Sequence, residues 1–429
     1  MKSLLSSPQS RYIDLQWVEN SLKFGVFLFP FSATIGGVGL TIALFSLWQQ
    51  RFYQIVSERF TWLLGLFSLW LVITTFFAFQ PILAFQGLPN FLPGILLLAA
   101  FPIFFANLCR LYQFAWWLVL TSILLTGFGF MQLGWGWESP PIFSSIGIKL
   151  LAYGNPDGRM SSFLMYANTL AIYLLISFLL ALGLWIDIYR HWQEKHRPEI
   201  VGKLIILSLA MVGNSLGLIF TNSRSAWGLA LLGVMAFAVY LRRYWVIYLA
   251  VIAVGMVVWA AWAPWGQGTM RELVPAYFWT RLTDELYDDR YVTALRTTQW
   301  KVATEMILQQ PWLGWGLRNF TPVYQTEMNV WMGHPHNLFL MLFAEIGIPG
   351  TLLFCAIVGN VIFRAVRNLV QWSNKQEKRE EHLLLFTYLI SFCSCILFNL
   401  FDVTLFDVRV NLLGWFLLSA ITGITKVRR

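Results

Sequence analysis

The sequence predicts an all-α polytopic membrane protein with about twelve transmembrane helices. Hydrophobic residues make up 58% of the 429 residues and charged residues only 12%, whereas a typical soluble domain carries roughly 25% charged residues. The apolar residues are gathered in runs of about 18 or more, the length that a helix needs to cross roughly 30 Å of hydrocarbon. Outer-membrane β-barrels alternate in shorter segments, so the pattern favours helices.

The apolar runs and the loops between them predict the topology. The runs lie near 61–79, 91–108, 114–131, 163–186, 203–221, 225–240, 244–263, 349–366, 383–400 and 411–425. Basic residues occupy every second loop, and the formal net charge is +9. Such loops stay on the cytoplasmic side of a membrane. We therefore expect the positive charge to set the topology, with both termini cytoplasmic, rather than to bind nucleic acid.

The first apolar stretch, about 18–48, decides the number of spans. Basic residues precede it and Arg51 follows it, so both of its ends should be cytoplasmic. Pro30 and Gly36-Gly37 interrupt it, and such residues break helices and form turns. A hairpin of two short helices, giving twelve spans, is the favoured interpretation. One tilted helix, giving eleven spans, is the alternative.

Four regions follow from this topology. We expect N-terminal transmembrane helices over 1–150, transmembrane helices with arginine-containing loops over 151–263, a large outer loop over 264–348 and C-terminal transmembrane helices over 349–429. The outer loop mixes acidic and basic residues, and its stretch 291–310 predicts an amphipathic helix that ends at Pro311, before a turn at Gly314 and Gly316. The chain shows no internal repeat, so the inverted-repeat signature of many transporters is missing.

Two histidines lie where the outer loop returns to the membrane, in Trp331-Met-Gly-His334-Pro-His336-Asn337. An imidazole at this position can act as a general base near neutral pH. Binding of a metal by the two histidines is possible, although no third ligand is obvious in the sequence. The structural alternative is that both histidines cap the following helix or form hydrogen bonds with it.

Arg224 lies between two apolar runs with almost no loop, on the side where the topology predicts few positive charges. Arginines at membrane depth are costly and usually functional. A guanidinium that binds an anion, best a diphosphate, explains this position. The alternative is an ion pair with a carboxylate such as Asp402 or Glu345.

Further polar candidates are expected on the same side. Arg159 directly precedes a span that contains Asn168, and Arg296 can project from the amphipathic helix, although simple solvation of Arg296 is an equal alternative. Asp402 and Asp407 follow an outer helix end, where either can orient a histidine or bind an arginine. The sequence has no glycine-rich phosphate loop and no Asp-x-Asp metal pair. These residues favour metal-independent chemistry, without a cofactor, on an anionic substrate carried by a lipid.

In this order the motifs resemble the O-antigen ligase/polymerase superfamily. The resemblance rests on five motifs between about 150 and 410, and the first 150 residues match only as hydrophobic spans. The motifs are Arg159…Asn168-Thr-Leu-Ala171, Asn222-Ser-Arg224-Ser-Ala-Trp, Arg296-x-x-x-Trp300…Pro311-Trp-Leu-Gly314-Trp-Gly316…Asn319-Phe320, His336-Asn337-x-x-Leu340…Glu345-x-Gly347-x-x-Gly350, and Leu400-Phe401-Asp402.

The resemblance implies an enzyme of the bacterial inner membrane that moves a glycan from an undecaprenyl-diphosphate carrier to an acceptor hydroxyl on the periplasmic face. It implies that His336 is the general base and that Asn337 fixes the helix start, with His334 beside them at the substrate. By the same resemblance, Arg224, Arg159 and Arg296 bind the diphosphate and stabilise its charge, Asp402 supports that cluster, and Asn168 is a substrate-binding residue. The acceptor is a glycolipid or another hydroxyl compound, for example lipid A core.

Two alternatives remain open at this point. The superfamily also contains polysaccharide polymerases that share these motifs, and sequence hardly separates them from ligases. Asn168-x-x-Ala171 and Leu400-Phe401-Asp402 are also similar to a branch linked to bicarbonate accumulation, which allows a small-anion transporter. His336-Asn337 matches the enzymatic branches, and the unusual charges gather on one side of the membrane rather than at its middle. Both observations favour an enzyme.

Overall fold

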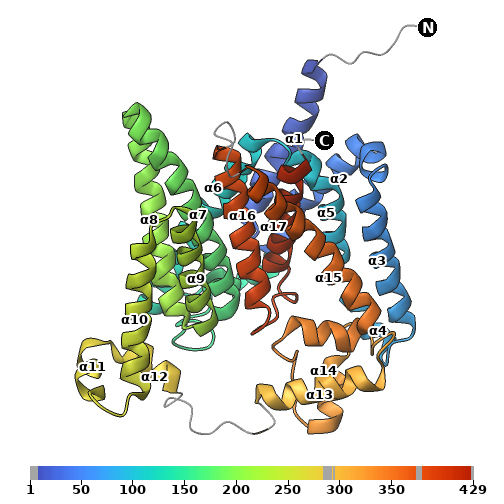
Figure 1. Cartoon of the computed structure of the whole chain (residues 1–429). Helices are drawn as coiled ribbons and strands as arrows, with labels where there is room; N and C mark the ends of the chain where they lie inside the picture. Colours follow the sequence, from blue (N-terminus) through green and yellow to red (C-terminus); the bar gives the residue numbers. More distant parts are fainter. Residues whose placement is uncertain (1–7, 284–291, 293–294, 373–378, 427–429) are drawn as a thin grey trace.

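A computed structural model describes residues 8–283, 292, 295–372 and 379–426 of the chain, and these residues form a helical bundle (Figure 1). The N-terminal part contains α1 (Pro8–Leu28), α2 (Ala33–Val56), α3 (Arg59–Phe76), α4 (Pro81–Gly87), the 3-10 helix η1 (Leu88–Asn90), α5 (Leu92–Phe104) and α6 (Leu108–Trp135). The middle part contains η2 (Pro141–Ile146), η3 (Ser162–Leu164), α7 (Ala167–Lys195), α8 (Pro198–Thr221), α9 (Arg224–Tyr240) and α10 (Tyr244–Trp262). The last part contains α11 (Gln267–Leu273), α12 (Ala276–Thr283), α13 (Arg296–Gln309), α14 (Phe320–Met328), α15 (Leu338–Trp372), α16 (Arg379–Phe398) and α17 (Val408–Lys426).

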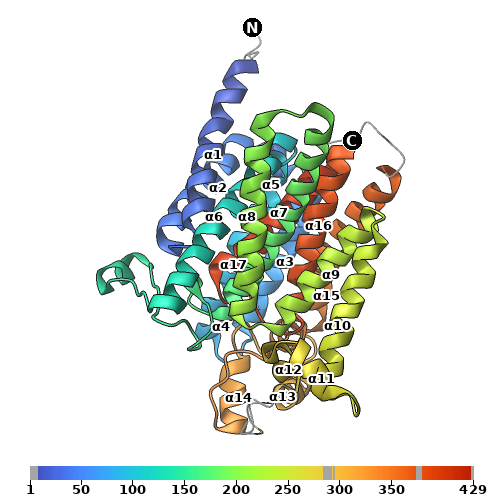
Figure 2. The ribbon, with the colours of Figure 1, turned by 90° about the vertical axis from the view of Figure 1, so that its left-hand side faces the viewer.

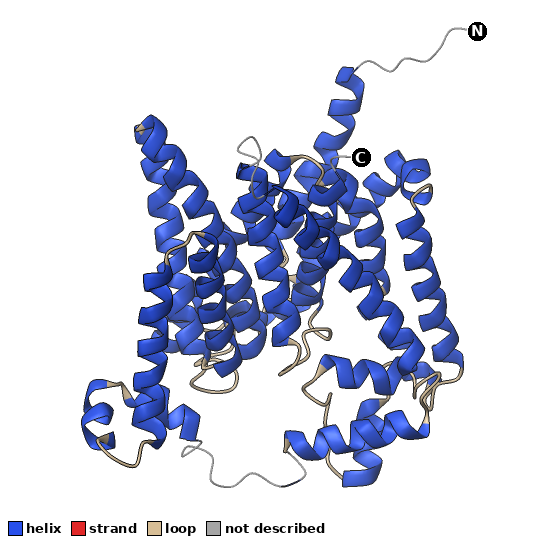
Figure 3. Cartoon of the chain, in the orientation of Figure 1, coloured by secondary structure: helices blue, strands red, loops and turns tan. Residues whose placement is uncertain are grey.

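The described residues contain helices and loops and no strand, which confirms the predicted all-α class (Figure 3). Nine of their helical segments are long and apolar enough to cross a membrane: α3, the α4–α5 unit, α6, α7, α8, α10, α15, α16 and α17. Helix α9 is apolar but shorter. The chain is therefore a multi-pass membrane protein, and the count of twelve spans, which needs α1, α2 and α9 in addition, stays a prediction.

The long helices run along a common direction, and the short helices α11 to α14 all lie at the same end of the bundle, called here the outer end, with α11 and α12 near α10 and with α13 and α14 near α15 (Figures 1 and 2). The start of α1 and the end of α17 lie at the opposite end. Helix α7 is buried among its neighbours along most of its length, whereas α10 is largely exposed at the edge. The predicted amphipathic helix corresponds to α13, which ends at Gln309, just before Pro311.

The apolar stretch 18–48 forms two helices, as the favoured interpretation predicted, and not one tilted helix. Helices α1 and α2 are joined by the turn 29–32, and their backbones nearly touch, because a Cβ added at Gly39 would lie 2.8 Å from the backbone nitrogen of Gly25. The Ser32 hydroxyl caps α2 by accepting a hydrogen bond from the Ile35 N–H (3.1 Å) and donates to the Ile146 carbonyl. The turn therefore packs against η2.

Helix α15 is kinked at Gly347. The backbone at this kink binds the chain between α13 and α14, which belongs to residues 295–337, called here the outer segment. Pro349 has no N–H to donate to the Glu345 carbonyl one turn earlier. That carbonyl accepts the Gly316 N–H instead (2.8 Å), and the neighbouring Ala344 carbonyl accepts the Trp315 N–H (2.9 Å). The backbone groups that the kink releases thus hold the predicted turn at Gly314 and Gly316, where both glycines have positive φ (71° and 93°).

Gly347→Ala is expected to destabilise the protein severely. Gly347 has φ 72° and ψ 173°, a combination that essentially only glycine adopts and that costs other residues about 1–3 kcal/mol. An added Cβ would also lie 2.1 Å from the Trp312 carbonyl oxygen. The measurement is the thermal unfolding midpoint and folded yield of the purified protein. Gly65→Ala in α3, where a Cβ meets nothing within 4 Å, should leave both unchanged.

Candidate active site

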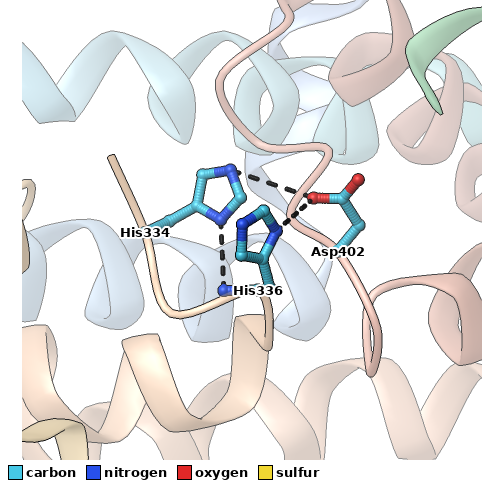
Figure 4. A group of neighbouring side chains, drawn as sticks. All are labelled: His334, His336 and Asp402. Atoms are coloured by element: carbon cyan, nitrogen blue, oxygen red, sulfur yellow. Dashed lines mark hydrogen bonds and ion pairs between the residues drawn. The ribbon is translucent and has the colours of Figure 1, made fainter. Parts of the chain in front are cut away.

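A histidine and an aspartate that are separated in the chain by α15 and α16 meet at the outer end of the bundle. His336 lies directly before α15, and Asp402 lies in the connection between α16 and α17. The His336 Nδ1–H donates to Asp402 Oδ1 across 3.2 Å (Figure 4). Because Nδ1 carries the proton, Nε2 of a neutral His336 has its lone pair available. Nε2 has no hydrogen-bond partner within the part of the chain that the structure describes.

Asp402 is held as an ionised carboxylate. It is buried, with 8% of its surface exposed, and burial alone raises the pKa of a carboxyl group. The hydrogen bond from His336 and the electrostatic attraction of both neighbouring imidazoles outweigh burial, so the pKa of Asp402 is lowered. The Val403 N–H also donates to Oδ1 (2.9 Å).

His334 is the neutral neighbour of this pair. Its Nδ1 accepts the His336 backbone N–H (3.2 Å), so the proton of the neutral ring is on Nε2, which lies 3.8 Å from Asp402 Oδ1 (Figure 4). Burial lowers the pKa of His334 to about 4, and the positive charges of His336 and Arg296 act in the same direction. His334 therefore stays uncharged at neutral pH and directs an N–H toward the carboxylate.

The loop that carries both histidines is fixed on two sides. The Trp300 indole of α13 donates to the Pro335 carbonyl (2.9 Å), and the Thr321 hydroxyl donates to the Gly333 carbonyl (3.1 Å). Asn337 caps α15, because its Oδ1 accepts the Leu340 N–H (3.1 Å). His336 itself has φ 51°, and such left-handed residues gather at functional sites, where the surrounding structure holds them.

A chain of hydrogen bonds connects the carboxylate to the junction between α8 and α9. The Asn168 amide donates to Asp402 Oδ2 (2.7 Å), and Arg159 donates through Nη2 to Asn168 Oδ1 (2.7 Å). The Nε–H of Arg159 donates to the Thr221 carbonyl (2.8 Å), three residues before Arg224. The Met160 N–H also donates to the Phe220 carbonyl (2.9 Å), which ties the Arg159 loop to the end of α8.

The two remaining predicted arginines lie at helix starts near this network. Arg224 is the first residue of α9 and is exposed, and Arg296 is the exposed first residue of α13. The charge of Arg296 reaches His334, because it contributes to the lowered pKa of that residue. The structure therefore collects all eight predicted site residues at the outer end. A direct contact joins Arg159, Asn168, Asp402, His336 and His334 into one network.

The two aspartates that the sequence could not assign have separate partners. Asp402 orients the histidines, whereas Asp407 accepts the Nε–H of Arg409 (3.0 Å). The same guanidinium donates to the Phe163 carbonyl (2.7 Å) and thereby holds the segment before α7. Glu345, the other carboxylate considered for Arg224, is buried and accepts the Phe320 N–H (3.2 Å). Arg409 was not predicted as important, although the Asp-x-Arg spacing carries the signal.

The sequence suggested no third metal ligand beside the histidines, but the structure places one there. Ligand atoms of His334, His336 and Asp402 lie within 4.8 Å of one another, and imidazole nitrogens with a carboxylate oxygen form a donor set that zinc accepts. However, His336 Nδ1 and Asp402 Oδ1 are joined by a hydrogen bond. A cation between these two atoms would have to replace that hydrogen bond.

Two cavities lie beside the network. The first, of about 270 Å³, is lined by apolar side chains of α15, α16 and α17, and its lining reaches Leu338, Asn399 and Thr404, close in sequence to His336 and Asp402. The second, of about 560 Å³, has a mixed polar and aromatic lining that includes His334. The His336–Asp402 pair therefore lies between an apolar cavity and a polar one.

A family model described as O-antigen ligase matches residues 209–355, and this match supports the resemblance to the O-antigen ligase superfamily. The matched part contains Arg224, Arg296, His334, His336 and Asn337, while Arg159, Asn168 and Asp402 lie outside it. A search among curated proteins gives no match. The superfamily acts in general on lipid-linked glycans and their acceptors.

Proposed function

We propose that the protein is a glycosyltransferase of the O-antigen ligase type. It transfers a glycan from an undecaprenyl-diphosphate carrier to an acceptor hydroxyl at the periplasmic face of the bacterial inner membrane. The observation that carries the proposal is the His336–Asp402 pair, whose Nε2 lone pair is available at the outer end of a chain that matches this superfamily. The hydrogen-bond chain through Asn168 and Arg159 toward the α8–α9 junction supports it.

In the proposed reaction, His336 Nε2 takes the proton of the acceptor hydroxyl. The acceptor oxygen attacks the anomeric carbon of the donor, and the bond between that carbon and the diphosphate oxygen breaks. Asp402 keeps the proton of His336 on Nδ1 and stabilises the imidazolium that forms. Direct displacement inverts the configuration at the anomeric carbon.

The departing group is a lipid diphosphate, and its growing negative charge needs cations at the membrane surface. Arg224 and Arg296, both exposed at helix starts, are proposed to bind it, since a guanidinium matches phosphate oxygens in a bidentate manner. Arg159 is proposed to assist them and to position Asn168, to which it already donates. The apolar cavity between α15, α16 and α17, which reaches Leu338 and Asn399, is suited to hold the start of the polyprenyl chain.

The test of this proposal is a glycan profile of cells in which the only copy of the protein is Arg224→Ala. Loss of one donor to a developing negative charge lowers rates by about 10²–10³-fold. Glycan on the acceptor should therefore disappear while the lipid-linked glycan accumulates, at an unchanged protein level. A normal profile would contradict the proposal and leave anion transport as the better explanation. An acceptor that carries a single glycan unit, rather than none, would identify a polymerase instead of a ligase.

Removal of metal ions is expected to leave the activity unchanged. Metal-independent catalysis follows from the hydrogen bond between His336 and Asp402, which a bound cation would displace. After incubation with EDTA, the transfer rate in isolated membranes should stay within about twofold of the untreated rate. If EDTA abolished transfer and added zinc restored it, the three residues of Figure 4 would be metal ligands and the base mechanism would be wrong.

A further inference from the structure

The proposed reaction assigns no role to the polar cavity at the outer end or to most of the side chains that line it. It has a volume of about 560 Å³, within the usual range for ligand sites, and is open to the outside. Four separate segments line it, and the residues that define its character are Gln80, Arg318, Gln325, Trp331, His334 and Phe406. Two primary amides, one guanidinium and two aromatic rings thus face one space.

This set of groups suits a saccharide better than a lipid or a free anion. Amide and guanidinium groups offer directed donors and acceptors for hydroxyl groups, while the C–H face of a sugar ring packs on an aromatic ring. Trp331 is 70% exposed, so the face of its ring is accessible to a ligand in the cavity. A lipid chain would leave the amides without partners, and an anion site would gather more than one cation.

The walls of the cavity are fixed before any ligand binds. Asn319 is fully buried and its Oδ1 accepts the backbone N–H of Gln80 (2.8 Å), so a residue from the N-terminal third of the chain is held beside α14. The Trp331 ring lies over Gly333, where an added Cβ would meet it at 3.3 Å. The Arg318 guanidinium lies over the Phe406 ring, 5.9 Å from its centre.

His334 forms the wall between this cavity and the proposed base. Its ring stacks on Phe406, with the centres 5.7 Å apart and the planes at 17°, and its other neighbour is His336, with ring centres 4.4 Å apart. A ligand that contacts His334 from the cavity is therefore separated from His336, the proposed base, by the His334 ring alone.

We propose that this cavity is a saccharide-binding subsite, in which Trp331 and Phe406 pack against sugar rings while Gln80, Gln325 and Arg318 bind their hydroxyl groups. The inference rests on the proposed function and extends it, because it assigns the glycan to a cavity that is separate from the arginines at α9 and α13. The saccharide belongs either to the donor or to the acceptor, and both share the chemistry that the cavity recognises.

The test separates binding from transfer by using the full-length His336→Ala protein, since His336 does not line the cavity. One probe is the lipid-free oligosaccharide that mild acid releases from the lipid-linked glycan of cells carrying this variant. The other probe is the oligosaccharide of the acceptor from the same cells. Trp331→Ala and Gln325→Ala are each added to the His336→Ala protein and are expected to weaken binding of one probe by about tenfold.

Matched controls come from the same outer segment. Trp312 is 74% exposed and Gln309 is an exposed residue of α13, and neither lines the cavity. Trp312→Ala and Gln309→Ala should leave binding of both probes unchanged. Weakened binding of the released donor oligosaccharide assigns the cavity to the donor, and weakened binding of the acceptor oligosaccharide assigns it to the acceptor.

The inference is wrong if neither oligosaccharide binds, or if both bind the cavity variants as tightly as the parent protein. Those results leave the proposed function standing as long as Arg224→Ala still abolishes glycan transfer in cells. Conversely, oligosaccharide binding that depends on Trp331 together with a normal glycan profile of the Arg224→Ala cells would support the saccharide subsite and contradict the transferase.

Discussion

His336→Ala should lower the rate of glycan transfer by about 10²–10⁴-fold, the usual contribution of a positioned general base. The alanine protein lacks the imidazole that is positioned to take the proton of the acceptor hydroxyl, so the attacking oxygen stays protonated. Donor binding should change little, because the proposed diphosphate partners lie at the starts of α9 and α13. The measurement is single-turnover transfer in isolated membranes with the donor in excess of its half-saturating concentration.

The control for this variant is His191→Gln. His191 lies in the last turns of α7 and binds Glu380 through Nε2 (2.9 Å), with almost the whole length of the helix between it and Asn168. Its replacement should leave the transfer rate unchanged. If the His336→Ala protein retained more than about a tenth of the wild-type rate, His336 would not be the base.

Asp402→Asn should reduce transfer by a similar amount, on the order of 10³-fold, because an amide cannot replace a carboxylate in this network. Asp402 accepts hydrogen bonds on both oxygens, from His336 and from Asn168. If the new NH₂ group faces Asn168, two donors oppose each other. If it faces His336, it donates to Nδ1, moves the ring proton to Nε2 and thereby removes the base.

A double variant tests whether the two residues act as one unit. His336→Ala combined with Asp402→Asn should be no slower than His336→Ala alone, since residues of one catalytic unit are not additive. Asp157→Asn is the matched control, because Asp157 is exposed on an outer loop and accepts the neighbouring Gly158 N–H (3.0 Å). Independent losses that multiply in the double variant would show that Asp402 does not act through His336.

Much of the fold could be predicted because its determinants are local. A low charged fraction and long apolar runs require helices in a membrane, and Pro30 with Gly36 predicted the hairpin of α1 and α2. Gly314 and Gly316 predicted a turn. What the turn binds could not be predicted, because its partner is the backbone that Pro349 releases in α15. Such pairing depends on tertiary position, which periodicity does not carry.

The site residues could be proposed singly but not connected. His336 and Arg224 were found from their unusual positions at the membrane surface, yet the order Arg159, Asn168, Asp402, His336 joins residues that are far apart in the chain. Asp402 and Asp407 could not be told apart, because both follow the same helix end. Gln80 could not be predicted at all, since tertiary contacts such as the hydrogen bond to the buried Asn319 bring it beside α14.

The kink at Gly347 divides α15 into two parts that contact different parts of the protein. Its first part, from Leu338 to Ile346, is tied to the outer segment through the carbonyls of Ala344 and Glu345. Its second part continues to Trp372 and belongs to a helix that is long and apolar enough to cross a membrane. A change in bilayer thickness makes a long spanning helix tilt, and Gly347 is where that tilt can be absorbed. The geometry around His336 should therefore be insulated from lipid composition, so that transfer rates change little between thin and thick membranes.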